Sequence, residues 1–448
     1  MPASTALRDI PGRAATWARR WSGILPLLVA EFILWTGFGA LLPVMPLYFT
    51  EQGVDIALLG FVIAAWPAAR LVTEPLFGVL ADRSPRVPLM VAGLVVAGSA
   101  VGAMAIWTGP ALFVGLRALS GLGTAMYDPA ARGYITDASP EDRRGEAFGM
   151  YSAAQNGGIL LGPAIGGLGT ALVGGYRFVL AFAAVTTFAA AIAVALRVRE
   201  APRHSPWTTG RSSDRVSSSG QTYAEFPAEA GHQPARASTL GGAPGSAASP
   251  IVAPRSLRNR FILAAMLVNL AGYFGGGLYE TIWALFVTDR GGSVELIGAT
   301  FAVFGLTTIL LSPFAGRIVD RRGPFPFIVS GVLVMVVTML IYPQVGEPLL
   351  YLPLVAIEAV GFSFLGPATY LVIARGTPEG RSSTAQGLLG AAGTIGTIAA
   401  SIGAGILAAI DLAIPFYVGA GVEFALLIVT LVVATRHLRA MQPRAARA

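Results

Sequence analysis

Four ionisable side chains interrupt stretches of this chain that are otherwise largely apolar, namely Glu31, Arg117, Glu280 and Glu358. A charged group at the centre of a bilayer costs about 2.5–3.5 kcal/mol, so such a residue faces a protein interior or a wet path rather than lipid. A carboxyl in that setting takes up a proton when it is desolvated and releases it when an arginine or a cationic ligand approaches. The four residues therefore predict reversible binding of protons or cations.

Glu31 is the first candidate for the acceptor of the proton or cation, and Glu280 and Glu358 come next. The alternative for each acid is a structural ion pair, which would explain its place in an apolar stretch equally well. Glu31 lies in one half of its stretch, whereas Arg117, Glu280 and Glu358 lie toward the other half of theirs. A contact between Glu31 and Arg117 is therefore not assured by depth.

Aromatic side chains accompany these acids along the chain. Trp35 and Phe38 follow Glu31, and Tyr273 precedes Glu280. Such rings could offer an adaptable apolar wall to a bulky ligand, with a flexible methionine such as Met45 beside them. Helix packing or contact with lipid is the alternative for each ring.

The elements that position these residues are long apolar helices. The 448 residues are 54% hydrophobic and 12% charged, with a mean hydropathy of +0.66, whereas about 25% of residues are charged in a soluble domain. Twelve stretches reach the length of about 20 residues that a spanning helix needs. They are 23–49, 57–80, 87–107, 109–132, 147–171, 176–197, 259–288, 295–317, 325–345, 348–374, 385–410 and 412–435.

A duplication organises these stretches into two sets of six. Gly78, Asp82 and Arg83 recur 238 positions later as Gly316, Asp320 and Arg321. The same offset relates many other pairs, among them Gly37 and Gly275, Thr50 and Thr288, Gly53 and Gly291, Gly60 and Gly298, and Gly158 and Gly396. Repeats in an apolar chain are typical of secondary transporters, whose substrate site lies between the halves.

Basic residues indicate the topology. All 31 are arginines, and 27 of them flank one side of the expected spans; the exceptions are Arg70, Arg117, Arg177 and Arg290. The positive-inside rule then places both termini in the cytoplasm, so the net charge of +7 does not indicate nucleic acid binding. Arg70 precedes Glu74 by four residues, and we expect the two to neutralise each other on one helical face.

The expected domains follow from these patterns. Residues 198–256 are rich in Ser, Gly, Pro and Ala, which is typical of a disordered linker. The predicted parts are a cytoplasmic N-terminal segment 1–22, a bundle 23–197, the cytoplasmic linker 198–256, a bundle 257–435 and a cytoplasmic tail 436–448. The chain has no Cys, and its three His lie in the linker and the tail. We therefore expect no disulfide, no metal site and no cofactor.

The loop after the second stretch carries a recognisable motif. It reads Gly78-Val-Leu-Ala-Asp82-Arg83-Ser-Pro-Arg86 and resembles the G-x-x-x-D-R-x-G-R signature of the major facilitator superfamily. The resemblance implies a latch that joins the two halves in the outward-facing state, with Asp82 capping the eleventh span and Arg86 pairing with Asp128. The first copy departs from the pattern at Pro85, which replaces a glycine. The second copy, at Gly316, Asp320 and Arg321, has Pro324 in place of the final arginine, so the first copy is the stronger candidate for the latch.

Two further motifs are similar to patterns of the same superfamily. Arg117-Ala-Leu-Ser-Gly121-Leu-Gly123 is similar to R-x-x-x-G-x-G, which implies a role for the arginine in proton coupling. The fifth stretch matches G-x-x-x-G-P-x-x-G-G, a pattern associated with antiporters, through Gly158, Gly162, Pro163, Gly166 and Gly167. Glycines four residues apart also allow plain close packing of helices. The second half has Ala400 and Ser401 in place of Gly162 and Pro163.

The resemblance implies an all-α polytopic membrane protein with twelve transmembrane helices in two pseudo-symmetric six-helix bundles. It also implies a monomeric, proton-driven exporter of small amphiphilic or cationic compounds in the plasma membrane, resembling the twelve-span drug:proton antiporters and working by alternating access. A sugar or metabolite transporter of the same superfamily is the alternative. A membrane enzyme fits less well, because the chain shows no metal-spaced His or Cys set, no nucleotide-binding Gly-Lys loop and no nucleophile-elbow Ser. A channel fits the repeat less well.

Overall fold

The computed structural model describes residues 21–139, 143–173, 175–200, 256–378 and 382–440. The parts predicted for 1–20, for 201–255 with His204 and His232, and for 441–448 lie outside these ranges. The described residues form helices and contain no strand, which confirms the all-α prediction. The helices are α3 (Leu25–Leu41), α4 (Met45–Glu51), α5 (Ile56–Arg83), α6 (Arg86–Ile106), α7 (Pro110–Ala138), α8 (Arg144–Val173), α9 (Arg177–Arg197), α10 (Arg260–Asp289), α11 (Val294–Arg322), α12 (Phe325–Ile341), α13 (Tyr351–Gly376), α14 (Ser382–Ala408) and α15 (Ile414–Ala440), with the short 3-10 helices η2 (Tyr342–Gln344) and η3 (Pro348–Leu350) before α13.

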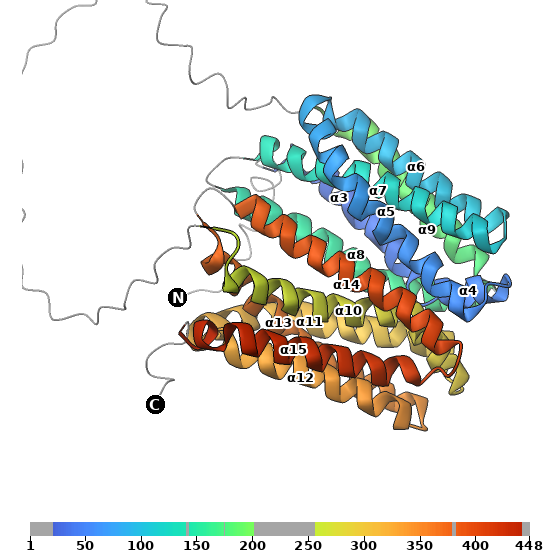
Figure 1. Cartoon of the computed structure of the whole chain (residues 1–448). Coiled ribbons are helices and arrows are strands. Elements are labelled where there is room, and N and C mark those ends of the chain that lie inside the picture. The colour runs from blue at the N-terminus through green and yellow to red at the C-terminus, as the bar shows by residue number, and fades with distance from the viewer. Residues whose placement is uncertain (1–20, 140–142, 174, 201–255, 379–381, 441–448) are drawn as a thin grey trace, which may run out of the picture.

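The helices form two bundles that lie side by side (Figure 1). Helices α3 to α9 pack mainly on one another, as do α10 to α15, and the bundles meet where α5 packs on α14 and α8 packs on α11. One end of the molecule carries Arg83, Arg86 and Arg322 at helix termini. It is named the basic end below, and the other is the opposite end.

The number of spans follows from length and composition. Ten helices in the described ranges are long and apolar enough to cross a membrane, and α3 with α4 makes an eleventh if this bent pair is one span. The pair bends by 49° at a break that falls beside Pro43 and Pro46, because proline disrupts helical hydrogen bonding. The twelfth expected span is α7, which contains Arg117, Asp128 and Arg132 and packs between α5 and α6.

The duplication is present in the backbone itself. Gly53 and Gly291 both have a φ of +82°, a conformation that glycine adopts without a Cβ penalty. The amide of Gly53 donates to Thr50 at 3.0 Å, and the amide of Gly291 donates to Thr288 at 2.9 Å. The turn after the first span of each bundle, which ends with α4 in one bundle and is α10 in the other, is therefore the same turn, built by residues at the same offset.

Candidate functional site

The two bundles touch closely at the opposite end. A Cβ added at Gly60 on α5 would lie 2.2 Å from the backbone oxygen of Ser401 on α14, and one at Gly405 would lie 2.7 Å from the backbone nitrogen of Gly60. Across the second contact, a Cβ at Gly298 on α11 would lie 2.8 Å from the backbone oxygen of Pro163 on α8. Glycines thus allow backbone to meet backbone on both sides of the seam.

The basic end lacks this close approach at the corresponding glycines. An added Cβ would meet nothing within 4 Å at Gly316, Gly387 or Gly390, and at Gly78 its nearest neighbour would be Pro129 of the same bundle, 4.0 Å away. Within the described ranges, no close approach between helices is therefore made at Gly78 in this conformation. The glycine contacts between the bundles are concentrated at the opposite end.

An ion pair joins the bundles inside the seam. A guanidinium nitrogen of Arg117 on α7 lies 3.3 Å from Oε1 of Glu280 on α10, and Arg117 also donates to the backbone oxygen of Ile63 at 3.3 Å. The Arg117 side chain is 2% exposed, whereas that of Glu280 is 20% exposed. The structure therefore brings together two of the four ionisable residues singled out from the sequence.

Glu280 borders a narrow, mostly apolar crevice that is too small to admit a water molecule in this conformation. The crevice is lined by Phe38, Leu41, Leu42 and Met45 from the first bundle and by Glu280 from the second. The ring of Trp35 packs edge-on against Phe38 at 5.1 Å, and Phe38 packs against Trp66 at 5.3 Å. A carboxylate beside aromatic and aliphatic walls is a setting that suits a cation with an apolar body.

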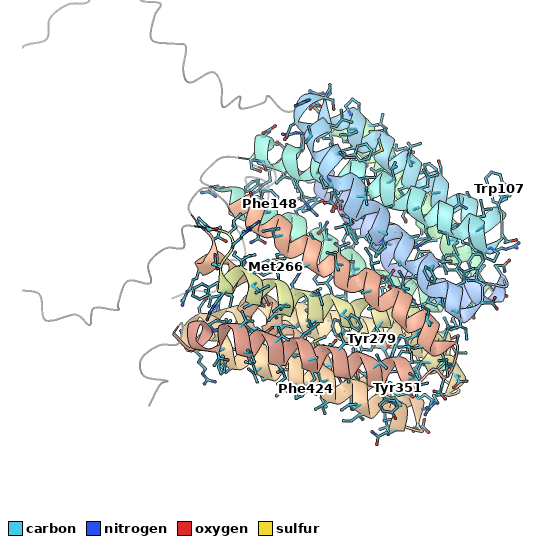
Figure 2. All side chains as sticks on the ribbon, viewed as in Figure 1. Trp107, Phe148, Met266, Tyr279, Tyr351 and Phe424 are labelled. Atoms are coloured by element: carbon cyan, nitrogen blue, oxygen red, sulfur yellow. The ribbon has the colours of Figure 1, made fainter. Side chains whose placement is uncertain are left out.

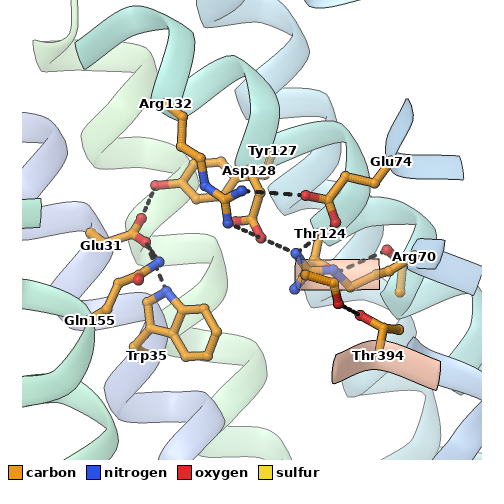
Figure 3. A network of polar contacts seen from close by, with 12 residues as sticks. Glu31, Trp35, Arg70, Glu74, Thr124, Tyr127, Asp128, Arg132, Gln155 and Thr394 are labelled. Carbon is orange, nitrogen blue, oxygen red and sulfur yellow. Dashed lines mark hydrogen bonds and ion pairs between the residues drawn. The ribbon is translucent and has the colours of Figure 1, made fainter. Parts of the chain in front are cut away.

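Glu31 lies in a separate polar cluster inside the first bundle (Figure 3). Its carboxyl is fully buried, with 0% exposure, and accepts three hydrogen bonds. Trp35 and Gln155 donate to Oε1 at 2.8 and 2.6 Å, and the Tyr127 hydroxyl donates to Oε2 at 2.5 Å. The sequence patterns did not single out Tyr127 or Gln155, because single polar residues on spans carry no periodic signal.

A second network lies beside Glu31 in the same bundle (Figure 3). Arg70 pairs with Glu74 at 3.0 Å, as expected from their spacing, and also with Asp128. Arg132 lies 3.5 Å from Glu74 and 3.9 Å from Asp128. The guanidinium of Arg70 lies over the ring of Trp66, 4.8 Å from its centroid. These charges are thus largely neutralised within the bundle.

The predicted pair between Arg86 and Asp128 is wrong for this conformation. Arg86 lies 2.6 Å from Asp137 and 3.9 Å from Asp82, while Asp128 is occupied by Arg70. Asp137 lies nine positions after Asp128, at the basic end of α7, where Arg86 begins α6. The geometry therefore keeps the arginine near the loop rather than deeper in the bundle.

A carboxylate after α9 also holds the motif loop. Oε1 and Oε2 of Glu200 accept the backbone amides of Arg86 and Val87 at 2.8 and 3.0 Å. A carboxylate there satisfies unpaired amides at the start of α6 and suits the positive end of the helix dipole. Pro85, which departs from the family pattern, offers no side-chain cap of its own. Glu200 takes over this task, and the sequence motifs gave no sign of it.

Comparison with known proteins agrees with this arrangement. The sequence model of the Major Facilitator Superfamily matches residues 27–281 and 265–447. The chain belongs to the Major Facilitator Superfamily. It is therefore a multi-pass membrane transporter and not an enzyme.

Sequence relatives with this superfamily's fold include bacterial resistance proteins. The chain is 30% identical to the quinolone resistance protein NorA of Staphylococcus aureus (strain MRSA252) over 136 residues, which span 30% of this chain and 35% of that protein. It is 28% identical to multidrug resistance protein 2 of Bacillus subtilis (strain 168) over 174 residues, which span 39% of this chain and 43% of that protein. The matched stretches thus cover less than half of each relative.

Solved transporters share the fold at low sequence identity. A bacterial homolog of the human lysosomal transporter Spinster, in an inward-facing and unoccupied conformation, has a TM-score of 0.67 and 17% identity, covering 94% of this chain and 97% of that chain. The nucleoside transporter NupG has a TM-score of 0.69 and 12% identity, covering 91% of this chain and 98% of that chain. These likenesses support the fold of two bundles.

The motif of glycines and proline on α8 that resembles the antiporter pattern makes contacts within the first bundle and with the second bundle. Cβ atoms added at Gly158, Gly162 and Gly166 on α8 would lie within 2.2–2.7 Å of the α3 backbone. The next residue, Gly167, faces α11 instead, where a Cβ would lie 3.1 Å from the Val294 oxygen. The motif therefore packs α8 inside its own bundle and presents its far end to the other bundle.

The remaining candidate residues lie in the second bundle. Glu358 on α13 is buried and accepts from the hydroxyls of Tyr279 and Tyr342 at 2.8 and 2.6 Å. Tyr273 on α10 is 53% exposed. The second copy of the latch motif, Gly316, Asp320 and Arg321, lies at the basic end of α11. Of the four ionisable residues, Glu31 and Glu358 thus lie within their own bundles and only Arg117 and Glu280 meet at the seam.

Proposed function

We propose that this chain is a proton-coupled antiporter that exports small amphiphilic or cationic compounds across the plasma membrane. In this proposal a monomer works by alternating access, its energy comes from the proton gradient, and the basic end and both termini face the cytoplasm. The resistance proteins named above support export of such compounds. The antiporter-type motif on α8 supports exchange rather than cotransport.

The ion pair between Arg117 and Glu280 carries the proposal. It spans the seam between the bundles, and Glu280 also borders the apolar crevice at Phe38 and Met45. A cationic compound that enters this crevice once it opens competes with Arg117 for the carboxylate, and a proton on Glu280 removes the charge–charge attraction. Both events weaken a link between the bundles, so binding and conformation become coupled.

Glu31 is the proposed acceptor of the proton within the first bundle. Three donors surround its carboxyl, and donors of this kind stabilise a charged carboxylate in a site that burial otherwise disfavours. Such a balance allows both protonation states to be populated during transport. The neighbouring pair of Arg70 with Asp128 places further charge close to this site.

Reconstituted liposomes test the proposal. Addition of an apolar cationic dye or drug is expected to drive protons in the direction opposite to the compound, and Glu31→Gln is expected to insert normally but to lose proton-driven export. The exposed Glu146→Gln on α8 serves as the matched control in the same bundle. Movement of protons and compound in the same direction would refute antiport, and full proton-driven efflux by Glu31→Gln would remove Glu31 from the mechanism.

A further inference from the structure

The second bundle contains a buried carboxyl that the proposed function does not use. Glu423 on α15 has 0% exposure, and neither of its carboxyl oxygens has a hydrogen-bond partner among the described residues. Because Glu423 is fully buried it faces the interior of the bundle, whereas the next residue on α15, Phe424 (Figure 2), is 46% exposed. A charged carboxylate buried without a partner costs several kcal/mol. Such burial favours the neutral, protonated form of the acid.

A glycine makes the niche that holds this carboxyl. Oε1 of Glu423 lies 2.7 Å from the place where a Cβ would stand at Gly275 on α10, and the methyl groups of Met335 and Met339 lie 3.2 and 3.3 Å from the same place. A larger residue than glycine would fill the niche. The surroundings are thus a tight space with apolar walls on the α12 side.

The repeat shows that packing alone does not require an acid here. Gly37 is the counterpart of Gly275 in the first bundle, and the side chain that lies against it belongs to Thr186 on α9. The Thr186 hydroxyl donates to the backbone oxygen of Ala183 at 2.9 Å, so it is satisfied within its own helix. Glu423 occupies the matching niche with a group that no donor among the described residues reaches.

A second carboxyl lies close to Glu423 in the same bundle. Glu358 receives the hydroxyls of Tyr279 and Tyr342, which follow Gly275 and Met339 of the niche by four and three residues, about one helical turn. Those two donors stabilise negative charge on Glu358, whereas two adjacent carboxylates in a low dielectric cannot both be charged without a large cost. The arrangement therefore favours a charged Glu358 beside a protonated Glu423.

The helices packed against α15 supply no charge that would change this assignment. Helices α12 and α14 contain no titratable residue within Phe325–Ile341 and Ser382–Ala408. On α10, Tyr279 points to Glu358 and Glu280 is paired with Arg117 across the seam. The other titratable residues of α10 lie at its ends, Arg260 and Asp289, or are exposed, Tyr273, so the groups that face the niche are Glu358, Tyr279 and Tyr342.

We propose that Glu358 and Glu423 form a proton site inside the second bundle, separate from the pair at the seam, with the proton on Glu423 while the opposite end is closed. When the bundle rearranges and water reaches Glu423, the O–H bond breaks, the proton passes to a water molecule and the carboxylate that remains is hydrated. A metal ion fits less well, because methionine methyl groups flank the niche and the described residues hold no cluster of three or more His, Cys, Asp or Glu. The role in coupling rests on the proposed antiport, whereas the protonation of Glu423 does not.

Infrared spectroscopy of the purified full chain tests the protonation directly. Wild-type protein at neutral pH is expected to show a carbonyl band of protonated carboxylic acid, shifted by D2O, with a component from Glu423 that Glu423→Gln loses and the exposed Glu347→Gln keeps. An unchanged band in Glu423→Gln would overturn the proposal. Glutamine has the shape of the protonated acid, so failure of Glu423→Gln to fold, with Glu347→Gln folding normally, would overturn it as well.

Transport tests the role of the site in coupling. Glu423→Gln liposomes are expected to keep substrate counterflow, which needs no net proton movement, within about twofold of wild type, while protons released per transported molecule fall by at least half. Wild-type proton release in Glu423→Gln would overturn the coupling role. Absence of proton release from wild-type protein would instead refute the proposed antiport and would leave the infrared result standing.

Discussion

A methyl group added at Gly405 is expected to open the opposite end of the seam. The Cβ of Gly405→Ala would lie 2.7 Å from the nitrogen and 2.9 Å from the Cα of Gly60, and 3.0 Å from the backbone oxygen of Ile56. All three neighbours are backbone atoms of α5, so no side chain can rotate away and α14 must move outward. The closed arrangement is therefore disfavoured, while an arrangement with the helices apart is not.

The expected change in the equilibrium between the closed and open arrangements follows from the cost of overpacking. Inserting one methyl group into a tight contact costs about 1–3 kcal/mol, which corresponds to a change of about 5- to 150-fold in a two-state equilibrium. Replacing a helical glycine by alanine also adds up to about 1 kcal/mol of helix stability, whatever the contacts. Gly403→Ala on the same helix shares this second effect but would place its Cβ in open space, so comparison of the two variants isolates the contact.

Distance measurements between spin labels provide the assay. The chain contains no native cysteine, so reporter cysteines at the exposed Asp55 before α5 and the exposed Ile410 after α14 are the only reactive thiols. Gly405→Ala is expected to populate a longer distance across the opposite end, whereas Gly403→Ala keeps the wild-type distribution. Equal distributions in both variants would refute the reasoning that backbone contact at Gly60 holds this end closed.

Three further predictions concern charges at the basic end and in the seam. Asp137→Asn removes the close partner of the largely buried Arg86 and is expected to lower stability by about 3 kcal/mol, seen as a lower melting temperature than that of wild type or of Glu146→Gln. Glu200→Gln weakens the cap of α6 by about 1 kcal/mol, and faster hydrogen exchange at the first amides of α6 measures it, with unchanged exchange speaking against the cap. Arg117→Ala leaves Glu280 without its partner and is expected to reduce transport more than about tenfold, whereas transport at the wild-type rate would show that the pair is dispensable.

Much of the fold could be predicted because it rests on local patterns. Apolar length and the 238-residue offset indicated both sets of helices, and Gly53 and Gly291 adopt the same positive φ because the same turn recurs. Helix α7 shows the limit of composition alone. It carries Arg117, Asp128 and Arg132 and is not among the ten helices apolar enough to span by themselves, so only its place between α5 and α6 keeps it in the bundle.

The candidate site could be predicted only in part, because contacts between helices depend on rotation about each helix axis. Depth along the spans could not show that Arg117 meets Glu280, and the family pattern placed Arg86 on Asp128 when Asp137 is the partner present. Glu423 was visible as an acid in an apolar stretch but was missed, since it belongs to no motif. Its significance appears only when its burial and lack of donors are known.

The geometry of the seam ties movement of the bundles to a change of charge. The glycine contacts at Gly60, Gly298 and Gly405 are van der Waals contacts and act over short distances, so a small separation breaks them. The pair of Arg117 and Glu280 is electrostatic and lies deeper, in surroundings that expose only 2% of the arginine. Separating two such charges without compensation costs several kcal/mol, more than the glycine contacts alone would resist. In the proposed antiport, neutralisation of Glu280 by a proton or replacement of Arg117 by a cation therefore lowers the cost of opening this end, just as loss of a glycine contact does, and this link between charge and opening is the physical basis for proposing exchange of protons against cationic compounds.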